Sequence, residues 1–215
     1  MPLDARCAAL IRALRELCPG VLPEAPLPPG EPGRPVPVQP EQFGQLAAVA
    51  VRQAAALAML GRLPVRDEDL PGAVIWEDGG AALAVGLAQL QVAVTEGNVT
   101  VTVPVYCDQL PRREGRVHVT FAVGAPGRPA GLLAATTTEP EGPRVVVEAW
   151  GEQLTALAWQ AVLDTAAGIA GHAGTDPDGA PLVATALVAA KDRLEVLPQA
   201  RHAFDRMPTG RAIVR

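Results

Sequence analysis

Between Ala73 and Trp150, apolar and polar residues alternate in short runs that are separated by tight turns. The turns contain glycine or proline, as in Glu96-Gly97-Asn98 and Glu139-Pro140-Glu141-Gly142. Turns this short join antiparallel neighbours, because parallel strands need long crossovers. The pattern therefore predicts an antiparallel β-meander, with strands at 73–76, about 82–95, 98–107, 116–123, 130–138 and 144–150. Near Ala88 the apolar residues shift between odd-numbered and even-numbered positions, which predicts a bulge or a break within 82–95.

Helical periodicity flanks this predicted sheet on both sides. Residues 41–61 are apolar on nearly every side and end at a glycine, which predicts a deeply buried helix. Residues 151–171 carry a regular apolar face and predict a long helix that covers the sheet. Residues 182–190 fit either a helix or a strand, and a strand at 193–197, a helix at 199–207 and a strand at 211–214 are predicted to follow. This order predicts an α+β fold of five to six antiparallel strands packed against helices, in one domain over 41–215.

The N-terminal 40 residues have a different pattern. Residues 4–18 predict an amphipathic helix, and residues 19–40 contain nine prolines. Because proline lacks the N–H that helices and strand ladders use, we expect 19–40 to be an extended linker or a wrapping arm. A tethered amphipathic helix needs a surface on which to bury its apolar side, and that surface belongs to the chain's own domain, to a neighbouring subunit or to another protein. Of these, we expect a second copy or a partner protein to bind the apolar positions Leu10, Ile11, Leu14 and Leu17.

Composition excludes several classes of function. The chain contains no serine, which excludes enzymes with a serine nucleophile, and its one lysine is Lys191. No zinc-ligand spacing, complete calcium loop or glycine-rich phosphate loop occurs, so we expect no metal and no cofactor. The acidic pI of about 5.2 argues against nucleic-acid binding. Residues 191–215 carry a net charge of +3, and this stretch is either a solvated surface or an anion site.

The expected location is the bacterial cytoplasm. Charged residues interrupt the N-terminus before an apolar segment of signal-peptide length can form. The longest uncharged run, 79–95, contains two glutamines and alternates like a strand, so we expect sheet and no membrane span. Three cysteines without a signal peptide argue against a disulfide framework. The ratio of 17 arginines to one lysine, with abundant alanine and proline, indicates a GC-rich genome.

Cys107 and His118 are the nearest approach to a cysteine nucleophile with a base. In a strand over 98–107, however, Cys107 shares the apolar face with Val99 and Val105. In a strand over 116–123, His118 lies on the face opposite to the apolar one. If the two strands pair, the thiol faces the core and the imidazole does not. We therefore expect Cys107 to be a structural thiol.

Three hypotheses for function follow, and the third is an accessory DNA or phosphate binder that uses the basic stretch 191–215. The first is a non-enzymatic structural or interaction subunit of a bacterial multi-protein assembly. The second is a small-molecule-binding or lyase-like α+β domain that holds its ligand between the sheet and helix 151–171. For the second hypothesis the candidate ligand-binding residues are Tyr106, His118 and Trp159. Tyr106 and His118 share the polar face of the predicted hairpin, which is either a ligand groove or an ordinary solvated face.

Overall fold

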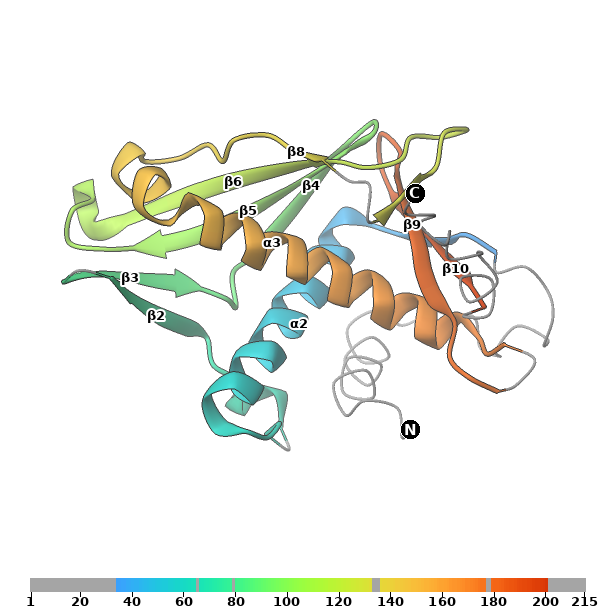
Figure 1. Cartoon of the computed structure of the whole chain (residues 1–215), viewed down its shortest axis with the longest axis horizontal. Coiled ribbons are helices and arrows are strands. Elements are labelled where there is room, and N and C mark those ends of the chain that lie inside the picture. The colour runs from blue at the N-terminus through green and yellow to red at the C-terminus, as the bar shows by residue number, and fades with distance from the viewer. Residues whose placement is uncertain (1–33, 65, 79, 133–135, 177–178, 201–215) are drawn as a thin grey trace, which may run out of the picture.

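The computed structural model describes residues 34–64, 66–78, 80–132, 136–176 and 179–200 as two antiparallel sheets and two long helices (Figure 1). The predicted α+β class, with antiparallel strands packed against helices, is confirmed. The predicted helix 4–18, with Leu10, Ile11, Leu14 and Leu17, lies outside the described residues. So do the predicted elements beyond residue 200.

The larger sheet contains six strands. They are β2 (Ala73–Asp78), β3 (Ala81–Gly86), β4 (Gln91–Thr95), β5 (Asn98–Tyr106), β6 (Glu114–Ala122) and β8 (Thr136–Thr137). Their order is β2-β3-β5-β6-β8, and β4 also pairs with β5. Two short 3₁₀ turns, η1 (Asp67–Asp69) and η2 (Pro111–Arg113), precede β2 and β6. The break predicted within 82–95 is confirmed, because β3 ends at Gly86 and β4 begins at Gln91.

Strand parity separates the two faces of the larger sheet, as the alternation predicts. Val99, Val101, Val103 and Val105 of β5 are fully buried, and so are Val117 and Val119 of β6. Both helices pack against this apolar face. The even-numbered residues of β5 and β6 point to the opposite face, which we call the open face.

The smaller sheet has the order β1-β10-β9-β7. Its strands are β1 (Val36–Val38), β7 (Ala130–Gly131), β9 (Val183–Ala189) and β10 (Leu194–Gln199). The ambiguous segment 182–190 is therefore a strand. In the hairpin that follows, a 2.8 Å hydrogen bond from Arg193 Nε to Glu195 Oε1, together with the carboxylate charge, raises the pKa of Arg193.

Two segments differ from the prediction within this sheet. The end of the proline-rich stretch was predicted to be linker or arm, but it forms the edge strand β1, which pairs with β10. An edge strand needs partners on one side only, so it tolerates Pro37. The predicted strand 130–138 is instead split, with β7 in the smaller sheet and β8 in the larger one.

The longest helix, α3 (Arg144–Ala173), begins earlier than predicted. The predicted strand 144–150 is wrong, because these residues form the first turns of α3. Val146, Trp150 and Leu154 lie at intervals of four residues, and all three are buried. This helical stripe packs on the larger sheet, and the C-terminal part of α3 contacts β9 and β10 (Figure 1). One helix therefore joins the two sheets.

The other long helix, α2 (Pro40–Leu60), agrees with the prediction for 41–61. Proline fits its first turn, and Gly61 ends the helix with a left-handed φ of 66° and an N–H bonded to the Leu57 carbonyl. Among the described residues α2 is the one helix long and apolar enough to cross a membrane. However, 56% of its most apolar window is buried inside the protein, as in a core helix.

A glycine joins the two sheets at one end. The Gly124 N–H donates to the Leu187 carbonyl, and the Gly124 carbonyl accepts from the Ala189 N–H. A Cβ at this position would lie 2.6 Å from the Ala130 nitrogen and 3.0 Å from the Leu187 oxygen. Both are backbone atoms, so only glycine fits here without a shift of the chain.

Candidate functional site

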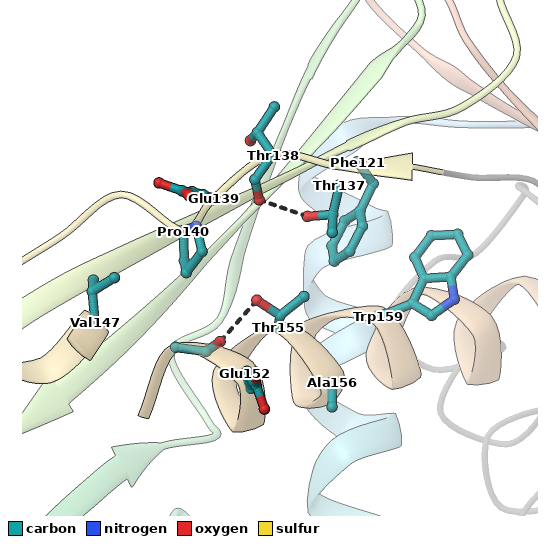
Figure 2. Close-up of a pocket in the computed structure, with 11 residues that line it drawn as sticks. Phe121, Thr137, Thr138, Glu139, Pro140, Val147, Glu152, Thr155, Ala156 and Trp159 are labelled. Carbon is teal, nitrogen blue, oxygen red and sulfur yellow. Dashed lines mark hydrogen bonds between the residues drawn. The ribbon is translucent and has the colours of Figure 1, made fainter. Parts of the chain in front are cut away.

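A groove of about 680 Å³ lies between the first half of α3 and the chain segment that includes and follows β8 (Figure 2). We call it the α3 groove. It is lined by Phe121, Thr137, Thr138, Glu139, Pro140, Val147, Gly151, Glu152, Thr155, Ala156 and Trp159. The helix residues recur at three- and four-residue intervals from Val147 to Trp159, so they form one stripe along α3. This stripe is about 18 Å long, from the rise per residue of an α-helix.

Two aromatic rings form one end of the α3 groove. The centroids of Phe121 and Trp159 are 4.8 Å apart, and the ring planes are tilted by 38°. Phe121 is only 3% exposed, whereas Trp159 is partly buried and packs against the core (Figure 2). The pair therefore supplies a fixed apolar surface at this end, of the kind that takes an apolar side chain.

The wall opposite α3 is held to β6. The Thr138 N–H donates to the Thr120 carbonyl at 3.2 Å. Farther along, His118 and Glu141 exchange backbone hydrogen bonds of 2.7 and 2.9 Å. A Cβ at Gly142 would lie 2.9 Å from the Arg116 carbonyl oxygen, so a glycine is needed for this close approach. The wall is therefore a fixed part of the sheet edge.

Toward the Val147 end of the α3 groove, Pro140 of the wall lies close to Gly151 of the helix. A Cβ at Gly151 would lie 3.2 Å from Pro140 Cγ and 3.6 Å from Val147 Cγ1, which shows how closely the wall approaches the helix. The Thr155 hydroxyl donates to the Gly151 carbonyl at 2.8 Å, so it is engaged within the helix (Figure 2). The floor of the α3 groove is thus mainly apolar.

The rim is acidic. Glu139 stands on the wall and Glu152 on the helix, and both side chains are exposed. Within the part of the chain that the structure describes, neither carboxylate forms an ion pair. Two carboxylates beside an apolar floor favour an apolar group that carries a positive charge.

The three predicted ligand residues do not come together. Trp159 lines the α3 groove, between sheet and helix as predicted. Tyr106 and His118 lie on the open face, where the Tyr106 hydroxyl donates to Gln89 Oε1 at 3.0 Å. His118 Nδ1 is 2.9 Å from Thr102 Oγ1 on the same face. Because these positions are even-numbered in their strands, they point away from α3.

The predicted separation of Cys107 and His118 is confirmed. Cys107 follows the last residue of β5, is a free thiol and packs partly buried against the core. His118 is exposed on the other side of the sheet. Among the described residues, no group of three or more His, Cys, Asp or Glu side chains is placed to hold a metal ion.

Sequence reasoning missed the wall of the α3 groove. Residues 130–138 were predicted as one strand and Glu139 to Gly142 as a turn, so neither was assigned a role. The strand predicted over 116–123 places Phe121 on the apolar face, opposite His118, but gives it no partner. Its contact with Trp159 joins a strand to a helix, and a periodic pattern within either element does not predict such a contact.

Comparison with family models, with curated proteins and with solved structures finds no match for this chain.

Proposed function

We propose that this protein is a non-enzymatic interaction subunit of a bacterial assembly, and that it binds a segment of a partner protein in the α3 groove. One observation carries the proposal: a mainly apolar floor runs about 18 Å along α3, beside an acidic rim. Elongated apolar grooves suit an extended or helical chain segment, whose side chains enter at intervals.

The lining specifies the chemistry of the partner segment. An apolar side chain would pack on Phe121 and Trp159, which already contact each other. A lysine or arginine would lie near Glu139 and Glu152, which are exposed at the rim. Exposed charge pairs contribute roughly 0.2–1 kcal/mol each, so the apolar floor supplies most of the affinity and the rim supplies selectivity.

The alternative is a small apolar ligand held in the same groove, between the sheet and helix α3. The aromatic pair at one end favours it, because ligand pockets are commonly lined by aromatic side chains. The length of the groove along α3 favours the protein segment, since a compact molecule would contact only part of that stripe.

A peptide-display selection against the full chain tests the proposal. Ala156→Trp places a bulky ring in the α3 groove, at an exposed helix position. Gln153→Trp adds the same ring at an exposed helix position outside the groove and is the matched control. We expect selected peptides to combine apolar residues with lysine or arginine, and to bind Gln153→Trp but not Ala156→Trp. Peptides that bind both variants equally would contradict the proposal. Binding of a small apolar dye without any selected peptide would favour the alternative.

A second contact with a partner or a second copy is proposed for Leu10, Ile11, Leu14 and Leu17. Because β1 is part of the smaller sheet, the appropriate truncation removes residues 1–33 and keeps Val36–Val38. We expect this truncation to lower the oligomeric mass in light scattering. An unchanged mass would count against this contact, and it would leave the α3 groove unaffected. The bacterial cytoplasm remains the proposed location, on the composition of the chain.

A further inference from the structure

A second depression, of about 440 Å³, lies on the open face of the larger sheet. We call it the polar site. Its polar side chains are Gln89, Gln91, Thr102, Tyr106, Glu114 and Arg116. They come from the loop between β3 and β4 and from the facing positions of β4, β5 and β6. The polar site is therefore on the opposite side of the sheet from the α3 groove.

The polar site lies where one strand ladder is interrupted. β5 pairs with β4 up to Thr102, and with β3 only from Val105 onward. Pro104 lies in the gap between the two partners and also lines the site. Proline has no N–H to donate, so it suits a place where the ladder is broken. Gln89 belongs to the loop that joins β3 to β4 across this gap, and Gln91 is the first residue of β4.

Internal hydrogen bonds hold three of the lining side chains. The Tyr106 hydroxyl donates to Gln89 Oε1 at 3.0 Å, which fixes the ring and leaves the Gln89 amide N–H₂ as a donor. Thr102 is only 9% exposed, and its hydroxyl lies 2.9 Å from His118 Nδ1. Side chains held in this way lose less conformational freedom when a ligand binds.

The polar site contains one charge of each sign. Glu114 and Arg116 are two residues apart on β6, so they share a face. Neither forms an ion pair with any residue that the structure describes. The site therefore combines a strong acceptor, a strong donor and two amides, with no net charge.

We propose that the polar site binds a small, neutral, polyhydroxylated ligand: a saccharide of one or two rings. Hydroxyl groups both donate and accept hydrogen bonds. One neutral ligand can therefore donate to the Glu114 carboxylate and accept from the Arg116 guanidinium. The exposed part of the Tyr106 ring supplies an apolar surface for the C–H groups of a sugar ring. The polar site shares no residue with the α3 groove, so the two proposals fail independently.

Saturation-transfer NMR on the full chain tests the polar site. The probes are glucose, galactose, mannose, maltose and cellobiose, with glycine and glutamine as zwitterionic comparators. We expect at least one saccharide to give a saturable signal. Arg116→Ala should weaken its binding by about tenfold or more, as expected when a charge-assisted hydrogen bond is lost. Arg128→Ala, at an exposed arginine outside the site, is the matched control and should leave binding unchanged.

A second variant covers the case in which Arg116→Ala does not fold. Glu114→Gln keeps the shape of the side chain, removes its charge and should also weaken binding. Three results would overturn the proposal. They are the absence of a saturable saccharide signal, binding of the amino acids in place of the sugars, and saccharide binding that folded Arg116 and Glu114 variants leave unchanged.

Discussion

The ring of Phe121 lies 4.8 Å from that of Trp159, centroid to centroid, and joins β6 to α3. This contact belongs both to the core and to the α3 groove, because Phe121 is nearly buried while Trp159 is partly exposed at the groove surface. The floor of the proposed binding site is therefore made by residues that also stabilise the fold.

Truncation of Phe121 should consequently destabilise the protein. We expect Phe121→Ala to lower the free energy of unfolding by about 3–5 kcal/mol, the usual cost of removing a buried phenyl ring. Urea denaturation followed by circular dichroism measures this value. Trp159→Phe keeps a ring at the contact and should cost markedly less. A loss below about 1 kcal/mol for Phe121→Ala would contradict the assigned packing.

Gly124→Ala tests the junction between the two sheets. The added methyl group would clash with backbone atoms of Ala130 and Leu187, which cannot rotate away. We expect a loss of about 1–3 kcal/mol in stability, as for other overpacked sites. Gly72→Ala is the control, since nothing lies within 4 Å of a Cβ there. Equal stability of the two variants would show that the sheets do not meet at Gly124.

Comparison of two truncations tests strand β1. Removal of residues 1–33 keeps Val36 and Val38, whereas removal of residues 1–39 deletes both. These valines are 6% and 1% exposed and pair with β10. Burial of each contributes about 1.5–3 kcal/mol, so the longer truncation should be less stable by roughly 3–6 kcal/mol in urea denaturation. Equal stability of the two truncated chains would mean that the proline-rich stretch does not join the sheet.

Thr102→Val tests the hydrogen bond on the open face. The valine keeps the shape of the buried side chain but removes the hydroxyl that faces His118 Nδ1. We expect a loss of about 0.5–1.5 kcal/mol, the net value of one such bond. His118→Ala should cost a similar amount, and the double variant should cost less than the sum of the two. Strict additivity in this cycle would show that the two side chains do not interact.

Alternation was sufficient to predict β5 and β6 and their faces. Val99, Val101, Val103 and Val105 are buried and His118 is exposed. Burial of one face specifies the register, since a slip of one residue would exchange the two faces. The same reasoning failed at 144–150, where Val145 and Val147 favour a strand locally. There the packing of Val146 and Trp150 against the sheet selects the helix instead.

The candidate site was less predictable than the fold. Of the three residues predicted to bind a ligand, Trp159 lines the α3 groove, but Tyr106 and His118 point to the other side of the sheet. The wall of the α3 groove depends on the chain crossing from the smaller sheet at β7 to the larger one at β8. That crossing is a tertiary relationship, so no local pattern in 130–143 contains it.

The most direct test of the central claim is a binding titration with the peptide that the full chain selects from a display library. The wild-type protein, Ala156→Trp and Gln153→Trp are compared by calorimetry. We predict that Ala156→Trp weakens binding by at least about a hundredfold, or about 2.8 kcal/mol, while Gln153→Trp stays within about twofold of wild type. Equal affinity for all three proteins would contradict the assignment of the α3 groove as the partner-binding site.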